Sequence, residues 1–342
     1  MPSLDWSKFE AQEEGVTLLA PCVSLTLYLE SVDEEGLLDF HQQATAVLGN
    51  RLTHYDTGSG KPRKLDARGQ SIVPSWKGKM NKPFAGLYVD FSGSPRGASA
   101  AELMFFISLE PHASPTASVA KKHWETVLKP TFAKHGRVNI MTSAQLRVGI
   151  PLDHPLAKDF NELRAWVGGL RLVREGLFIS GQCGYGLSYH GGASSSAYTT
   201  VAEGLRRLCL QHPGLDFDMT SGLFRLLIYQ PPERILHKVR RANWLTLLSS
   251  NCVEQTGGRE RLEASLVGSS ALVHALGGGA LMIQAASAPR VGDPATGDLL
   301  PEYQHVARAI RPARVDVLSQ APLGVDQEWV QEWLESLERA SP

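Results

Sequence analysis

Short apolar segments with the composition of strands alternate with helix-like segments along the whole chain. Residues 24–29 carry β-branched and aromatic residues between polar clusters, which is typical of a strand. Residues 33–48 place apolar side chains every three or four positions and stop at Gly49, which indicates an amphipathic helix. Because glycine-rich turns also join strands as hairpins, the alternation predicts an α+β fold, with antiparallel or mixed sheets and packed helices, rather than a doubly wound sheet.

The two halves of the chain share this rhythm, which suggests two similar halves, although no residue-level repeat accompanies it. For 342 residues, a typical domain of roughly 150 residues also suggests about two domains. Two prolines in segment 151–158 mark the predicted boundary, between an N-terminal half over 1–155 and a C-terminal half over 156–342 that can pack as one continuous domain. We expect later helices over 118–128, 159–173, 199–211, 301–310 and 326–337, and later strands over 103–109, 177–189, 224–229 and 243–248, with a hairpin over 272–285.

Composition excludes several classes of protein. A hydrophobic fraction of 43% with a net charge of −1 excludes a disordered chain and gives no overall field toward DNA or an anionic membrane. The four cysteines have neither metal-ligand nor disulfide-framework spacing, so we expect buried thiols in a reducing cytoplasm. The acidic start does not resemble a signal peptide, and no apolar run is long enough to span a membrane. The sequence therefore predicts a soluble, cytoplasmic protein.

Phosphate- and nucleotide-binding motifs are incomplete. Residues 58–61 (GSGK) resemble the end of a phosphate-binding loop, but Pro62 stands where that loop needs Ser or Thr. The glycines of segment 181–186 lack the last glycine of a dinucleotide fingerprint. Glycines within a strand more often mark a bulge or a close approach of backbones. We expect no cofactor.

Catalytic and metal motifs are incomplete as well. Segment 186–190 (GLSYH) nearly spells a nucleophile elbow around Ser188, but it ends in His190 where the elbow needs Gly. Asp216 and Asp218 could form a carboxylate pair, yet no second acidic cluster accompanies them, so a loop or capping role is favoured. The histidines lack metal-ligand spacing. We therefore expect no catalytic residues, no bound metal and no enzyme activity.

Charge is distributed unevenly. Residues 1–35 hold eight acidic residues against Lys8 alone, a net charge of −7. Residues 51–82 hold eight basic and two acidic residues, a net charge of +6. The basic stretch lacks repeated aromatic platforms for nucleic acid, since Trp76 is the only obvious one, and a solvated loop is the favoured interpretation. The acidic stretch suits a basic protein partner.

A series of motifs in the C-terminal third resembles a known family. Residues 238–314 contain KVRRANWLTLL, GGRERLEASL, GGGALMIQAASAPRVGD and LPEYQHVARAIRPAR, in that order. This order is similar to the type VI secretion immunity proteins for VRR-Nuc-type nuclease toxins, over about residues 20–315. The chain departs from the family pattern at Ala286 and at Arg240-Arg241, where glycine is common. The motif residues are Asn243, Trp244, Gly257, Gly258, Ile283, Gln284, Pro289, Gly292, Asp293 and Tyr303.

The resemblance implies a bacterial immunity protein that binds and neutralises a cognate nuclease toxin of the PD-(D/E)xK kind. Such a nuclease needs a basic groove for DNA, so an inhibitor can present acidic side chains to it or fill it. The candidates for toxin binding are Glu13, Glu14, Asp33, Glu34 and Glu35. We expect no direct contact with nucleic acid or a membrane.

The alternative function is a hydrolase built on Ser188 or His190. A nuclease-toxin gene beside this one would favour immunity, whereas an activity lost on Ser188→Ala would favour the enzyme. For the acidic residues, the competing interpretation is a solvated tail and a helix N-terminus, where carboxylates are favourable in any protein.

Overall fold

The computed structural model describes residues 4–29, 32–79, 86–95, 97–108, 143–189, 195–217, 228–229, 236–315 and 327–338. Its strands are β1 (Ala11–Glu13), β2 (Val16–Leu29), β3 (His54–Asp56), β4 (Arg63–Lys64), β5 (Gly86–Ser92), β6 (Glu102–Ser108), β7 (Ser143–Pro151), β8 (Ser180–Tyr189), β9 (Asp216–Phe217), β10 (Ile228–Tyr229), β11 (Leu236–His237), β12 (Leu245–Leu248), β13 (Leu272–Ala275) and β14 (Leu281–Gln284). Its α-helices are α1 (Glu34–Leu48), α2 (Ala67–Gln70), α5 (Phe160–Gly169), α6 (Arg171–Arg174), α7 (Ser195–Gln211), α8 (Ser250–Gln255), α9 (Arg259–Ser265), α10 (Pro301–Ile310) and α11 (Gln327–Glu335).

One large sheet organises these elements. Its order from edge to edge is β13-β14-β12-β8-β2-β7-β6-β5-β3-β4, and β1 and β9 join it beside β2 and β8, which makes twelve strands among the described residues. All neighbours are antiparallel except β8 and β9. The predicted α+β class is therefore confirmed.

The centre of the sheet joins the N-terminal and C-terminal parts of the chain. Strands β2 and β8 pair over ten residues, from Leu19 opposite Tyr189 to Tyr28 opposite Ser180. The sheet thus continues across segment 151–158, where the sequence suggested a boundary. The division at residue 155 remains a prediction.

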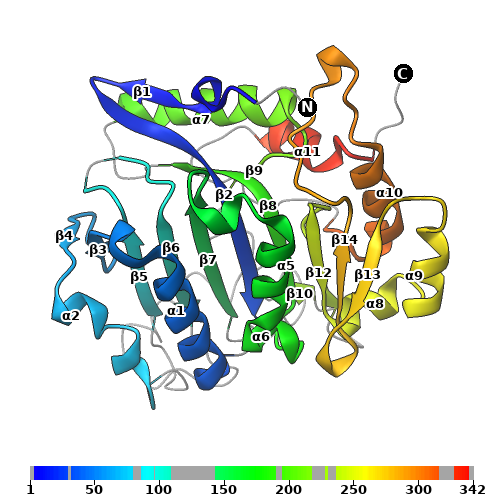
Figure 1. Cartoon of the computed structure of the whole chain (residues 1–342), viewed down its shortest axis with the longest axis horizontal. Coiled ribbons are helices and arrows are strands. Elements are labelled where there is room, and N and C mark those ends of the chain that lie inside the picture. Colours follow the sequence, from blue (N-terminus) through cyan, green and yellow to red (C-terminus); the bar gives the residue numbers. More distant parts are fainter. Residues whose placement is uncertain are drawn as a thin grey trace, which may run out of the picture.

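Helices α1, α5 and α6 cover one face of the sheet (Figure 1). That face of β2 presents Val23, Leu25 and Leu27, which belong to the main hydrophobic core. Helix α1 begins where the Asp33 carboxylate accepts the Gly36 N–H at 2.7 Å, and it buries Phe40 in the same core. The apolar spacing of residues 33–48 therefore becomes a helix, as the sequence predicted.

The opposite face of the central strands is polar but buried. Ser24 and Thr26 lie on this face of β2, and each is less than 5% exposed. Arg147 of β7 forms an ion pair of 3.1 Å with Glu102 of β6. Buried polar groups of this kind need partners, because an unpaired one costs free energy on folding.

Helices α7 and α11 cross one end of the sheet and form a second core with the start of β2 (Figure 1). Leu18, Leu19, Leu205 and Trp333 are among its buried members. This core attaches the C-terminal helix to the strand that begins near the N-terminus.

The structure differs from the predicted helix over 159–173. Helix α5 ends at Gly169, Leu170 adopts an extended ψ of 129°, and α6 starts as a separate turn at Arg171. Two glycines weaken the end of α5, and the Asp39 carboxylate accepts the Arg171 N–H at 2.8 Å. The predicted helix over 118–128 lies outside the described residues, as do 224–227 and Asp326 of the predicted later elements.

The four cysteines are free and buried, which confirms the prediction of buried thiols. Burial raises the pKa of the Cys22 thiol to about 12 and that of Cys252 to about 11. Within the ranges that the structure describes, none of the helices combines the length and the apolar character that crossing a membrane requires.

We predict that Trp244→Ala lowers the free energy of unfolding by about 3–5 kcal/mol, because the indole is fully buried and its loss leaves a cavity. Trp244→Phe keeps most of the ring and loses the hydrogen bond from Nε1 to the Ala286 carbonyl, 2.8 Å away, so it should cost less. Urea denaturation followed by circular dichroism measures both variants. A wild-type midpoint for Trp244→Ala would contradict this prediction.

Candidate functional site

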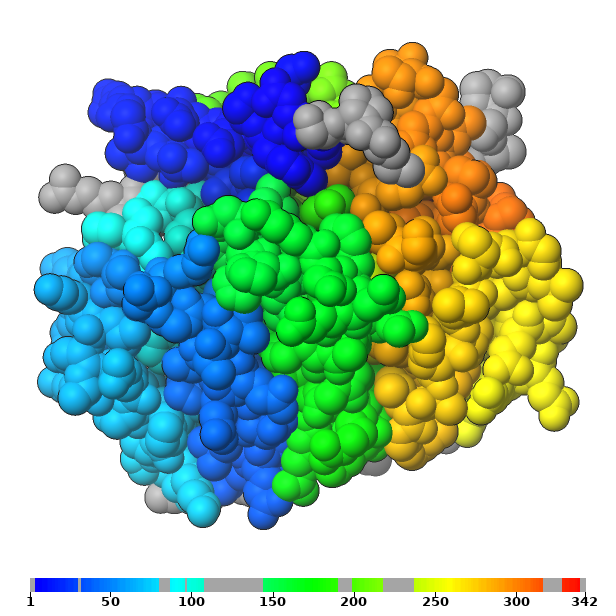
Figure 2. Space-filling model, in the orientation of Figure 1, coloured from blue at the N-terminus to red at the C-terminus, as the bar shows by residue number. Residues whose placement is uncertain are grey.

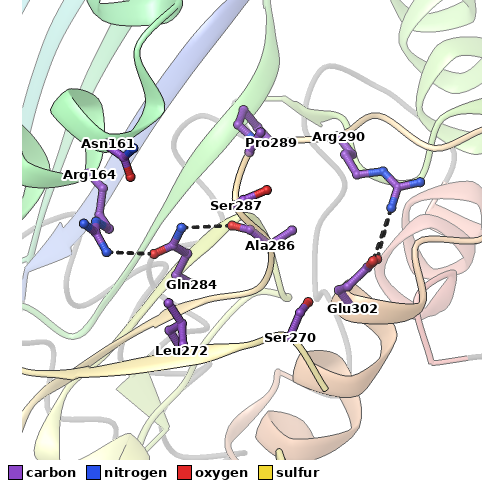
Figure 3. A pocket seen from close by; sticks show the side chains of 11 residues that line it. Asn161, Arg164, Ser270, Leu272, Gln284, Ala286, Ser287, Pro289, Arg290 and Glu302 are labelled. Carbon is purple, nitrogen blue, oxygen red and sulfur yellow. Dashed lines mark hydrogen bonds and ion pairs between the residues drawn. The ribbon is translucent and has the colours of Figure 1, made fainter. Parts of the chain in front are cut away.

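A pocket of about 510 Å³ lies where α5, the end of β14 and the first turn of α10 come together (Figure 3). Segments that are far apart in the sequence form its walls. The lining residues are Asn161, Arg164, Ser270, Leu272, Gln284, Ala286, Ser287, Ala288, Pro289, Arg290 and Glu302.

Gln284 connects the walls of this pocket. It is the last residue of β14 and is 4% exposed. Its amide Nε2 donates to the Ala286 carbonyl at 3.0 Å, and its Oε1 accepts from Arg164 Nη1 at 3.1 Å. The Ala286 carbonyl also accepts the Trp244 indole N–H. One buried amide therefore fixes the chain just after β14 and holds helix α5 against it.

Arg290 forms the opposite wall. Its guanidinium pairs with Asp298 at 2.5 Å and with Glu302 at 3.2 Å. Its backbone N–H donates to the Tyr303 hydroxyl at 3.0 Å, and burial raises the pKa of that hydroxyl. These bonds attach segment 285–290 to α10, so the pocket has a defined shape.

Arg164 is the one lining cation that forms no ion pair with a described residue; its partner is the neutral amide of Gln284. A guanidinium has five N–H donors, so most of them face the pocket or water. Arg164 lies three positions after Asn161, on the same side of α5 (Figure 3). Neither residue was predicted as a site residue from the sequence, although a spacing of three positions places both on one face of the predicted helix.

Several residues of the predicted family motif meet around this pocket. Gln284 and Pro289 line it, while Trp244, Ile283 and Tyr303 lie fully buried behind it. The other motif residues shape the backbone. Asn243 packs against Gly184, Gly292 has a φ of +71°, Asp293 caps a 3-10 turn, and Gly257 and Gly258 precede α9 with φ values of +93° and +88°.

The structure separates the five acidic candidates into two groups at opposite ends of β2. Glu13 and Glu14 lie at the turn between β1 and β2, whereas Asp33, Glu34 and Glu35 lie at the start of α1. A strand of 14 residues with a rise of about 3.3 Å per residue spans about 40 Å. The two groups therefore form two surfaces.

The group at α1 makes several contacts within the protein. Asp33 caps the helix, and Glu34 accepts the Gly78 N–H at 3.0 Å. Glu35 pairs with Arg171, which raises the pKa of that guanidinium. These contacts show a capping and packing role for the three residues in the folded protein.

The group at the hairpin is more open. Glu14 is exposed and has a φ of +50°, followed by Gly15 at +76°. Two positive φ values match the tight turn that favours Asn-Gly, so a glutamate in the first position carries a conformational cost.

The other motifs considered in the sequence lie at positions that do not form a catalytic or binding site in the described part of the chain. Segment 58–61 is an exposed turn whose amides donate to the Asp56 carboxylate. Ser188 is 2% exposed within β8, where a substrate does not reach its hydroxyl, and His190 lies outside the described residues. In the part of the chain that the structure describes, no three His, Cys, Asp or Glu residues gather in a way that could hold a metal ion.

Asp216 lies in strand β9 and forms a buried ion pair, so the loop or capping role favoured from the sequence was wrong for it; Asp218 lies outside the described residues. Arg240 is 1% exposed and pairs with the Asp216 carboxylate. Its Nε donates to Gln182 Oε1 at 3.0 Å, and Nη1 donates to the Phe217 carbonyl at 3.0 Å. The basic pair at 240–241 therefore lies inside the protein; the Arg241 guanidinium stacks 4.2 Å from the Trp333 ring centroid.

Comparison with known proteins identifies the class. The family model described as type VI immunity for VRR-NUC matches residues 118–334, more than half of the chain, and the protein belongs to this family. The match contains every residue that lines the pocket, whereas the five acidic candidates precede it.

A solved structure shares the fold. It is a Pseudomonas aeruginosa type VI secretion system protein, PA0821, which is 17% identical, with a TM-score of 0.68 over 96% of this chain and 87% of that one. No curated protein sequence matches the chain.

We predict that Asp216→Leu lowers the free energy of unfolding by about 3–5 kcal/mol, because it leaves the Arg240 charge buried without its carboxylate. The double variant Asp216→Leu/Arg240→Met removes both charges and should be more stable than the single variant. Urea denaturation of the four proteins of this cycle gives the coupling energy. Additive effects of the two single substitutions would contradict a functioning ion pair.

Proposed function

We propose that this protein is an immunity protein that binds a VRR-Nuc effector of the type VI secretion system and neutralises it by occluding its DNA-binding or active site. The observation that carries the proposal is the family match over residues 118–334. The partner is then the effector itself, met in the cytoplasm, where the DNA is.

The fold suits inhibition by binding. A nuclease needs an open groove for DNA, and a protein that covers the groove blocks every substrate at once. In the described part of the chain, the large sheet and the hydrophobic cores packed on it present a surface that is already ordered, which lowers the entropic cost of association. A stable complex needs an interface on the order of 1,600 Å² in total.

No enzyme activity is part of the proposal. Ser188 is buried in the sheet, and Asp216 is held by Arg240. Two polar residues of the pocket have structural roles, Gln284 through hydrogen bonds and Arg290 through ion pairs. These observations favour binding over a hydrolase.

The acidic residues near the N-terminus are proposed to steer the encounter with the basic groove. Glu13 and Glu14 are the stronger candidates, because the exposed Glu14 adopts a positive φ in a tight turn. A costly conformation at an exposed position suggests a role outside folding. Asp33, Glu34 and Glu35 contribute charge at the other end of β2 while they cap and support α1.

We predict that the purified protein abolishes DNA cleavage by the cognate VRR-Nuc domain at a molar ratio of one to one. Plasmid nicking assays with rising amounts of the protein measure this, and an unrelated nuclease serves as the control. Continued cleavage at saturating amounts, or equal inhibition of the unrelated nuclease, would refute the proposed function.

We predict that Glu13→Gln/Glu14→Gln slows association with the effector and flattens its dependence on salt, since charges at the rim of an interface act mainly on the on-rate and Glu14 is exposed while Glu13 is half-buried. The matched variant Asp33→Asn/Glu34→Gln/Glu35→Gln should change thermal stability more than the on-rate, because these carboxylates have partners within the protein. Biolayer interferometry across a salt series separates the effects. Wild-type association rates and salt slopes for both variants would exclude electrostatic steering by this segment.

A further inference from the structure

The two edges of the large sheet differ in their side chains. Strand β4 at one edge consists of Arg63 and Lys64, both exposed. Charged residues on an edge strand discourage pairing with another chain. Strand β13 at the other edge reads Leu-Val-His-Ala and contains no Lys, Arg, Asp, Glu or Pro. Only one edge therefore carries the usual protection.

The unprotected edge also exposes apolar surface. Leu272 of β13 is 53% exposed, and Val267 in the preceding turn is 81% exposed. They are two of the four large hydrophobic residues that are exposed in the described part of the chain.

Hydrogen bonds on both sides of β14 establish which groups of β13 point outward. Leu276 N–H donates to the Ala280 carbonyl at 2.9 Å, and Ala285 N–H donates to the Trp244 carbonyl at 2.8 Å. Hydrogen-bonded and non-hydrogen-bonded residue pairs alternate along an antiparallel ladder. Both bonds therefore imply that the backbone N–H and C=O groups of Leu272 and His274 point toward β14. The N–H and C=O groups of Val273 and Ala275 then point away from the sheet, and no described residue bonds to them.

The pocket with Arg164 opens beside this edge. Leu272 lines the pocket together with Gln284, its partner residue on β14. His274 Nε2 lies 3.3 Å from Gln284 Oε1, the atom that also accepts from Arg164. In Figure 2 the green surface of α5 adjoins the gold surface of the β13–β14 hairpin. An edge strand, an apolar side chain and a cation that has no carboxylate partner among the described residues therefore lie together.

We propose that the β13 edge and this pocket form a docking surface for an extended, acidic segment of the effector. The segment adds to the sheet as a strand through the outward groups of Val273 and Ala275, and one of its carboxylates enters the pocket to meet Arg164. The positive charge of Arg164 favours an acidic segment, because a carboxylate supplies the counter-ion that this guanidinium lacks among the described residues. Main-chain bonds supply affinity, and the pocket supplies selectivity. The inference rests on the proposed function.

The test uses two variants at the surface and two matched controls. Ala275→Pro removes an outward N–H, which an edge strand tolerates, and Arg164→Gln removes the charge. The first control is Lys64→Pro on β4. The Lys64 N–H also points away from the sheet. Leu65 N–H donates to the Thr53 carbonyl, and because hydrogen-bonded pairs alternate along the β3–β4 ladder, the next pair, His54 and Lys64, is not hydrogen-bonded. The second control is Arg63→Gln. Affinity for the effector's nuclease domain is measured by biolayer interferometry, and folding by thermal melts.

We expect Ala275→Pro and Arg164→Gln each to weaken binding at least tenfold, with both controls at wild-type affinity. If the wild type binds and both surface variants bind equally well, the docking surface is elsewhere and the proposed function stands. If the wild type does not bind the effector, the proposed function and this inference both fail.

Hydrogen–deuterium exchange provides a readout that does not depend on the variants folding. In the wild-type protein, a peptide covering β13 should exchange more slowly when the effector is bound. Unchanged exchange there in a saturated complex would overturn the proposal. A dimer of the protein alone that Ala275→Pro dissociates would show that a second copy occupies the edge, and would also overturn it.

Discussion

The pairing of β2 with β8 is the constraint on which the rest of the structure depends. It joins the two ends of the sheet, and the segments at 216 and 238–243 pack onto β8. Three glycines of β8 leave room for the side chains packed against this pair of strands. A Cβ at Gly181 would collide with Leu27 and Leu247, one at Gly184 with Asn243, and one at Gly186 with Ser24. The glycines that resemble part of a nucleotide-binding motif are therefore positions where side chains from neighbouring segments of the protein approach the β8 backbone closely.

The sequence predicted the elements whose signal is local. Helices α1 and α10 and the β13–β14 hairpin follow from apolar spacing, caps and turn glycines in one segment each. The helix over 159–173 was predicted too long, because its break depends on Asp39, which lies 132 positions away from Arg171. The pocket could not be predicted for the same reason, since Arg164 and Gln284 meet only in the fold.

Counting charges along the sequence was the least reliable way to predict which charged residues share one surface of the folded protein. The net charge of −7 over residues 1–35 suggested one acidic patch, but the structure places these acidic residues at opposite ends of β2. Likewise, the adjacent charges of Arg240 and Arg241 do not lie on the surface, because both side chains are buried beside Asp216 and the Trp333 ring. A sum over a segment carries no information on direction, which only the tertiary structure supplies.

The position of β2 in the sheet also affects how the chain folds as it is synthesised. Apart from β1, which pairs with the first residues of β2, the strands that pair with β2 come late in the sequence, β7 from Ser143 and β8 from Ser180 to Tyr189. At a synthesis rate of about 5–20 residues per second, the strand waits about 8–30 s for its second neighbour. A highly apolar strand thus spends that time without its full set of partners, and a chain whose synthesis ends before β8 has a central strand that lacks one of its two long partners, β7 and β8.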